Sequence, residues 1–172
     1  MSTSSFRPRR SALYMPGSRL AALKKARCLE TDCIIMDLED ATAPDSKARA
    51  RSVVMEEIAK GGYGHREIIV RVNHLGTEWG RQDVIAVSES EADAILIPKV
   101  ESVSEVEEVQ RILSESGGRK EIDLWCMIET PKGVLNVAEI CRGLVKEEPE
   151  PYSLRGICMG FADLGNPPND SL

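Results

Sequence analysis

The segment CIIMDLED, residues 33–40, decides the fold class of this 172-residue chain. Its first four residues are apolar, and three acids follow within the last four positions. A short apolar run without polar alternation is typical of a strand that is covered on both faces, as in a parallel sheet. Side chains alternate along an extended strand, so Asp37 and Glu39 point to the same side. We expect at least one of these two carboxylates to reach a central site.

Five other runs along the chain are also short and largely apolar. With the first, the predicted strands cover residues 12–15, 33–38, 67–72, 94–97, 122–128 and 156–159. Helical patterns separate these strands. Ser102 and Glu105 form a capping box at the start of one predicted helix, which ends at Gly117-Gly118. Thr130 and Pro131 are the cap and first residue of the next predicted helix. The remaining helices are predicted over residues 18–29, 46–60 and 77–88.

Six β-α units of roughly 25 to 35 residues predict a parallel sheet with covering helices. An open doubly wound sheet and a (β/α)8 TIM barrel both satisfy this α/β alternation. The chain has neither G-x-G-x-x-G after its first strand nor G-x-x-x-x-G-K-[ST], the usual nucleotide cradles of open sheets. We therefore predict a barrel of which residues 11–172 supply about six strands, truncated at the C-terminal side. Residues 1–10 are predicted to be a flexible N-terminus.

Charged residues stand at or just beyond the ends of five predicted strands. They are Asp37, Arg71, Lys99, Glu129 and Asp163. The C-terminal ends of parallel strands open onto one face, and chemistry at the ends of many strands is typical of the barrel. The sequence therefore predicts one active-site face.

Glu129 and Asp163 are candidate metal ligands, because two carboxylates and water make the hard oxygen site that Mg²⁺ prefers. Glu129 could instead stabilise the start of the helix from Pro131, and Asp163 could be a turn residue before Gly165. Arg71 interrupts the apolar run IIVRVN. Its guanidinium is suited to bidentate binding of a substrate carboxylate, and the alternative is a structural ion pair with an acid of residues 37–40.

Composition excludes several classes of protein. The chain is 42% hydrophobic and 29% charged, as expected of a globular domain, and its net charge of −6 argues against a nucleic-acid partner. No stretch approaches the roughly 20 apolar residues that cross a bilayer, so no membrane partner is expected. We expect a cytoplasmic protein, with mitochondrial import as the alternative because residues 1–10 are rich in Ser and Arg. The five cysteines form no C-x-x-C pair and are expected to be free thiols.

The chain resembles the citrate lyase β-subunit-like family of the HpcH/HpaI aldolase/citrate lyase superfamily, which includes malyl-CoA, citramalyl-CoA and citryl lyases. The resemblance runs from about Ser11 to Leu164. It rests on six ordered motifs, RSALYMPGSR, DLEDATAPDSK, VRVN, IPKVES, IET and GFADL.

The resemblance implies a TIM barrel that binds Mg²⁺ and cleaves or forms the carbon–carbon bond of a 3-hydroxyacyl thioester. The products would be acetyl-CoA or a homologue and a 2-oxo acid such as glyoxylate, pyruvate or oxaloacetate. The partners would be a CoA or acyl-carrier thioester and the oxo acid, and such proteins commonly form trimers or hexamers.

The resemblance also implies roles for particular residues. Glu129 and Asp163 match the metal ligands, and Arg71, with Glu129, matches the site of the oxo-acid carboxylate. Glu39 and Asp40 match nearby catalytic acids that organise water, metal or arginine.

Tyr14, Arg19 and Lys25 fall where such enzymes contact the CoA nucleotide. As alternatives, Tyr14 belongs to the core, and Arg19 and Lys25 form the exposed face of the first helix.

The chain departs from the family pattern after the motif GFADL, which ends at Leu164. In the lyases a later segment supplies an acid for the proton at the thioester α-carbon, and residues 166–172 no longer follow the pattern closely. Two alternatives follow, an Mg²⁺ aldolase acting on free 2-oxo acids, and an inactive homologue that serves as a structural or regulatory partner.

Overall fold

Six parallel strands alternate with helices in the computed structural model, which describes residues 7–144 and 151–165. The strands are β1 (Ala12–Pro16), β2 (Cys33–Asp37), β3 (Glu67–Arg71), β4 (Ala94–Ile97), β5 (Asp123–Ile128) and β6 (Leu154–Met159). The helices are α1 (Leu20–Ala26), α2 (Lys47–Lys60), α3 (Gly80–Ser88), α4 (Val103–Ser116), α5 (Pro131–Leu144) and α6 (Phe161–Gly165), with a 3-10 turn, η1, at Pro44–Ser46.

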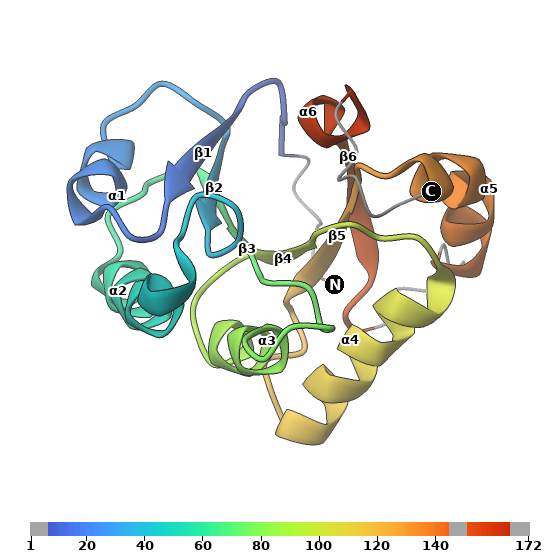
Figure 1. Ribbon diagram of the computed structural model, residues 1–172. Coiled ribbons are helices and arrows are strands. Elements are labelled where there is room, and N and C mark those ends of the chain that lie inside the picture. Colours follow the sequence, from blue (N-terminus) through green and yellow to red (C-terminus); the bar gives the residue numbers. More distant parts are fainter. Residues whose placement is uncertain (1–6, 145–150, 166–172) are drawn as a thin grey trace.

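The sheet order is β1-β2-β3-β4-β5-β6, so strands that follow one another in the chain are neighbours in the sheet. Figure 1 shows the strands as an arc with α1 to α5 on its outer side. This is the winding of a (β/α)8 barrel, which confirms the predicted fold class and the six strands.

Alternation along the strands divides the core into two layers. The outer layer lies between the sheet and the helices and includes Ile34, Met36 and Ile95. The inner layer lines the concave face of the sheet and includes Ile35, Leu96 and Trp125. Because the side-chain period of a strand is two, the next inward position after Ile35 is Asp37, which places a charge above an apolar layer.

The element boundaries differ most from the predicted ones at the first and third helices, and the first helix covers only Leu20–Ala26 of the predicted 18–29. The third helix begins at Gly80 and not at Thr77, because the hydroxyl and N–H of Thr77 both donate to the carbonyl of His74 and close a turn. Ser102 occupies the cap position of α4 but makes no side-chain cap hydrogen bond. The carboxylate of Glu105 instead accepts the N–H of Glu101 (2.7 Å).

Other helix signals act as the sequence predicts. The hydroxyl of Thr130 accepts the N–H of Gly133 at 3.0 Å and caps α5. Gly117 adopts a left-handed conformation (φ 69°) that ends α4. No helix in the described ranges is long and apolar enough to cross a membrane.

Three arginines attach the N-terminal segment to the strand starts, at the end of the sheet opposite the predicted site. Arg7 pairs with Asp93, Arg9 with Glu67 and Arg10 with Asp32. The Arg9 guanidinium binds Glu67 through two 2.7 Å hydrogen bonds and lies 4.9 Å from the centre of the Trp125 ring.

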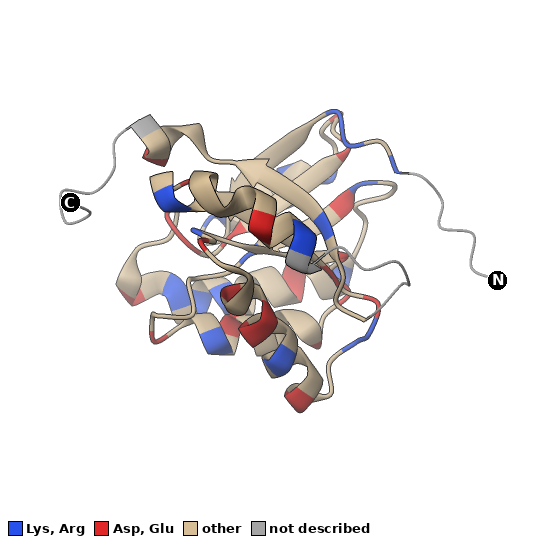
Figure 2. Ribbon diagram, turned by 90° about the vertical axis from the view of Figure 1, so that its right-hand side faces the viewer, with Lys and Arg blue, Asp and Glu red and all other residues tan. Residues whose placement is uncertain are grey.

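Flexibility of residues 1–10 stays a prediction, and residues 1–6 lie outside the described part. Acidic and basic residues are interspersed over the face shown in Figure 2.

We predict that Arg9→Ala destabilises the protein by about 2 kcal/mol, because it leaves the buried Glu67 carboxylate without its guanidinium. Urea unfolding followed by tryptophan fluorescence measures the effect. Arg7→Ala is the matched control, since both members of its ion pair are substantially exposed and it should cost no more than about 0.5 kcal/mol. Equal losses in the two variants would contradict the prediction.

Candidate active site

A buried ion pair between Arg71 and Asp37 joins the C-terminal ends of β2 and β3. The two residues are directly paired in the sheet register. Nε and Nη2 of Arg71 donate to the two oxygens of Asp37 at 2.8 and 2.7 Å. Although burial opposes ionisation, the hydrogen bonds and charge of Arg71 hold the pKa of Asp37 below its usual value. The ion pair that the sequence left open as an alternative is therefore present, and binding of a substrate carboxylate by Arg71 stays a prediction.

The remaining guanidinium nitrogen of Arg71 faces two further acids. Nη1 lies 3.1 Å from Glu39 Oε2 and 3.3 Å from Asp40 Oδ2. Asp37 and Glu39 both reach Arg71, as predicted, although β2 ends at Asp37 and Glu39 lies in the loop that follows it. The ring of Tyr14 lies 5.2 Å from the guanidinium carbon of Arg71. Glu39, Asp40, Arg71 and Tyr14 are therefore parts of one constellation.

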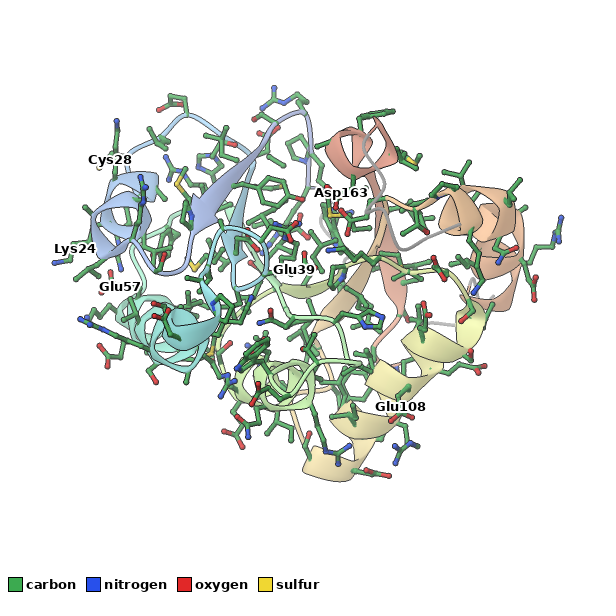
Figure 3. The ribbon with its side chains drawn as sticks, in the orientation of Figure 1. Lys24, Cys28, Glu39, Glu57, Glu108 and Asp163 are labelled. Carbon is green, nitrogen blue, oxygen red and sulfur yellow. The ribbon has the colours of Figure 1, made fainter. Side chains whose placement is uncertain are left out.

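Lys99 links this constellation to Glu129 and Asp163. Its backbone N–H donates to Glu129 Oε1 at 2.9 Å, while its Nζ lies 2.5 Å from Glu39 Oε1 and 4.0 Å from Asp163 Oδ2. The strand-end pattern singles out Lys99, but sequence reasoning assigns it no role. The two candidate metal ligands thus lie on one face beside the same lysine, and Figure 3 shows Glu39 and Asp163 together on the inner side of the arc.

The carboxylate of Glu129 follows β5 into a cramped position. A Cβ at Gly160, just after β6, would lie 2.6 Å from Glu129 Cβ and 2.8 Å from Oε2, so only glycine fits there. Burial raises the pKa of Glu129 to about 7, and the N–H of Lys99 offsets this only in part. Asp163 lies in the first turn of α6, and its side chain is 38% exposed.

The buried charge of Glu129 makes this site suitable for a divalent cation. Glu129 is a desolvated carboxylate whose charge is incompletely compensated, and a nearby cation would supply the missing charge. No group of three or more His, Cys, Asp or Glu side chains within the described residues is arranged to hold a metal. Two carboxylates, with the other positions left to water and ligand oxygens, match the coordination habit of Mg²⁺. Ligation by Glu129 and Asp163 stays a prediction.

A buried polar network, which sequence reasoning missed, holds the loop after β2. Nζ of Lys47 donates to the carbonyls of Leu38 and Glu39 at 3.0 Å and to Asn73 Oδ1 at 2.5 Å. Asn73 in turn donates to Asp83 on α3 at 2.6 Å, and Arg51 on α2 donates to the other oxygen of Asp83 at 2.6 Å. The only sequence signal is that Lys47 and Asn73 end the motifs DLEDATAPDSK and VRVN.

The three predicted CoA contacts differ in their surroundings. Tyr14 is 42% exposed, and its hydroxyl lies 3.6 Å from Met127 Sδ on the inner face. Burial raises the pKa of Tyr14 to about 12. Arg19, at the cap position of α1, and Lys25, within α1, are both exposed. Contact of these side chains with CoA stays a prediction.

Comparison with known proteins shows which family the chain resembles over most of its length. The family model HpcH/HpaI aldolase/citrate lyase matches residues 10–166. A (3S)-malyl-CoA thioesterase of Cereibacter sphaeroides (strain KD131 / KCTC 12085) is 46% identical over 157 residues, which cover 91% of this chain and 50% of that protein. An L-malyl-CoA/beta-methylmalyl-CoA lyase of Cereibacter sphaeroides (strain ATCC 17029 / ATH 2.4.9) is 36% identical over 165 residues, covering 92% and 50%. The chain spans about half the length of these relatives.

Solved structures of the same kind superpose on the chain. One is the citrate lyase beta subunit from M. tuberculosis complexed with oxaloacetate and magnesium, with a TM-score of 0.68 and 26% sequence identity. The match covers 89% of this chain and 58% of the chain in that structure. Another is CitE from Mycobacterium tuberculosis in complex with magnesium, acetoacetate and coenzyme A, with a TM-score of 0.66 and 25% sequence identity. That match covers 89% of this chain and 49% of the chain in that structure.

The raised pKa of Glu129 predicts a pH-dependent stability. Between about pH 5 and pH 7 this carboxyl holds its proton in the folded protein and loses it in the unfolded chain, so its contribution to stability falls as pH rises. Glu129→Gln removes this titration. In the presence of a chelator, the variant should melt at the wild-type temperature near pH 5 and roughly 7 °C higher at pH 8, because the pKa shift corresponds to about 3 kcal/mol. A temperature difference that does not grow with pH would contradict the assignment.

The buried network predicts a specific cost for Lys47→Met. The substitution keeps the length of the side chain but leaves the buried carbonyls of Leu38 and Glu39 without this donor, so we expect a loss of about 2 kcal/mol. Chemical denaturation measures it. The exposed Lys24→Met is the control and should stay within about 0.5 kcal/mol of the wild type. Equal stability of the two variants would refute the role given to Lys47.

Proposed function

The chain belongs to the HpcH/HpaI aldolase/citrate lyase family, and from this membership and the geometry of the site we propose that it carries the active-site face of an Mg²⁺-dependent carbon–carbon lyase. The proposed substrate is a 3-hydroxyacyl thioester of the malyl, citramalyl or citryl type. The proposed products are acetyl-CoA or a homologue and a 2-oxo acid. The observation that carries the proposal is the convergence of Arg71, Lys99, Glu129 and Asp163 on one face.

Arg71 is the proposed binding group for the carboxylate of the 2-oxo acid. Two of its nitrogens are fixed by Asp37, so the guanidinium has one orientation and presents Nη1 toward Glu39 and Asp40. A preorganised guanidinium binds a carboxylate at a lower entropic cost than a free side chain does. A ligand carboxylate would take the place beside Nη1 that the exposed Asp40 occupies.

Glu129 and Asp163 are the proposed Mg²⁺ ligands. When bound, Mg²⁺ supplies Lewis-acid polarisation of the 2-oxo or 2-hydroxy oxygen. Glu39 is the proposed proton-holding group beside that oxygen, because burial raises its pKa while Lys99 and Arg71 keep it oriented. The reaction breaks the bond between the hydroxyl-bearing carbon and the thioester α-carbon, and the electron pair of that bond leaves on the thioester as an enolate. The hydroxyl proton is lost as the 2-oxo group forms, and the α-carbon of the enolate takes up a proton to give acetyl-CoA or its homologue.

Hydrolysis of the thioester is a second candidate function, favoured by the 46% identity to a (3S)-malyl-CoA thioesterase. The two reactions on malyl-CoA give different products, since a lyase releases glyoxylate and acetyl-CoA and a thioesterase releases malate and free CoA. An assay that measures glyoxylate and free thiol in parallel, with and without Mg²⁺, therefore separates them. Glyoxylate without free thiol supports the lyase, and free thiol without glyoxylate replaces it with the second candidate.

The metal and oxo-acid site predicts Mg²⁺-dependent binding of oxaloacetate, pyruvate or glyoxylate in calorimetry. Glu129→Gln should weaken the binding of the oxo acid about 100-fold, because it removes a charged oxygen ligand. Glu108→Gln, a substitution of a partly exposed residue on α4, is the control and should bind as the wild type does. Equal binding with and without Mg²⁺ would show that Glu129 and Asp163 do not hold the cation.

A further inference from the structure

Lys99 adopts a backbone conformation that is unusual for its residue type. Its φ of 51° lies in the left-handed region, which glycine and asparagine tolerate better than lysine. Strained conformations of this kind persist where the surroundings enforce them, and they concentrate at functional sites. Here the N–H of Lys99 donates to the buried Glu129 carboxylate, which ties the conformation to the candidate metal ligand.

The ammonium of Lys99 lies among carboxylates from different parts of the chain. Nζ is 2.5 Å from Glu39 Oε1, 3.6 Å from Asp40 Oδ1 and 4.0 Å from Asp163 Oδ2. Glu39 and Asp40 follow β2, whereas Asp163 lies on α6. Arg71, the other cation of this constellation, is held by Asp37 and faces Glu39 and Asp40, whereas Lys99 also reaches Asp163. Lys99 therefore supplies the positive charge on the side of the site where Glu129 and Asp163 lie.

We propose that Lys99 is an internal counter-ion that competes with the divalent cation. This inference rests on the proposed function, because it concerns the same cation site. An ammonium 4.0 Å from Asp163 neutralises part of the charge that would attract a cation and repels a second cation placed beside Asp163. Binding of Mg²⁺ through Glu129 and Asp163 thus requires the Lys99 ammonium to move away from Asp163.

A consequence is that Lys99 couples the cation to the oxo acid. Mg²⁺ alone meets the repulsion of the ammonium, whereas an oxo-acid carboxylate brings negative charge that the displaced ammonium contacts. Mg²⁺ and the oxo acid therefore strengthen each other's binding, and by linkage the coupling is the same in both directions. Removing the Lys99 charge tightens Mg²⁺ binding and weakens this coupling.

The test is calorimetric titration of the metal-free protein with Mg²⁺ alone, at constant ionic strength. Lys99→Asn removes the charge and keeps a residue that tolerates positive φ, so the N–H contact to Glu129 survives. Its dissociation constant for Mg²⁺ should fall about tenfold. Lys99→Arg keeps the charge and should bind as the wild type does. Lys60→Met, which removes a lysine charge from the C-terminal turn of α2, controls for net charge and should not change the affinity.

Each outcome has a distinct meaning. Unchanged or weaker Mg²⁺ binding by Lys99→Asn, with normal binding by the wild type, overturns the role of Lys99 and leaves the proposed function standing. No Mg²⁺ binding by any variant, the wild type included, overturns both. Thermal melting monitors folding, and Lys99→Gly, which accepts the same φ without strain, replaces Lys99→Asn if that variant is unfolded.

Discussion

The buried pair of Arg71 and Asp37 is the constraint on which the candidate site depends. Burying two charges is costly unless each is paired and fully hydrogen-bonded. Here Asp37 accepts two hydrogen bonds from Arg71 and the N–H groups of Glu39 and Ala41, which satisfies the carboxylate. The same contacts fix the backbone of the loop after β2. Glu39 is consequently directed toward Nη1 of Arg71, and through Glu39 the position of Lys99 is set.

Along the inner face of the sheet, a structural ion pair lies at the strand starts and the candidate active site lies at the strand ends. At the strand starts, Arg9 and Glu67 form an ion pair beside Trp125. The apolar layer that includes Ile35, Ile69 and Leu96 comes next. Arg71 and Glu129 stand at the strand ends. Because side chains alternate with a period of two, every second residue of each strand faces inward. The arrangement matches that of TIM barrels, in which the active site lies at the C-terminal ends of the strands.

The strands could be predicted because burial on both faces leaves a continuous apolar run, and the range 94–97 is correct to the residue. The short helix α6 was not predicted, since five residues carry too few periodic positions to show a helical pattern. The sequence does not decide between an ion pair and a ligand contact for Arg71, because the register that sets Asp37 opposite Arg71 is not visible in either strand alone. The sequence does not predict the hydrogen-bond network of Lys47, Asn73 and Asp83, because these contacts depend on how α2 and α3 pack against the sheet.

We propose that Glu129 and Asp163 hold one divalent cation on the face that Arg71 and Lys99 share. Mn²⁺ can stand in for Mg²⁺ and scatters X-rays anomalously, so diffraction from crystals grown with Mn²⁺ and oxaloacetate locates the cation directly. We expect one anomalous peak within coordination distance of both the Glu129 and Asp163 carboxylates, with an oxaloacetate carboxylate beside Arg71. A peak that touches neither carboxylate, or oxaloacetate bound away from Arg71, would contradict it.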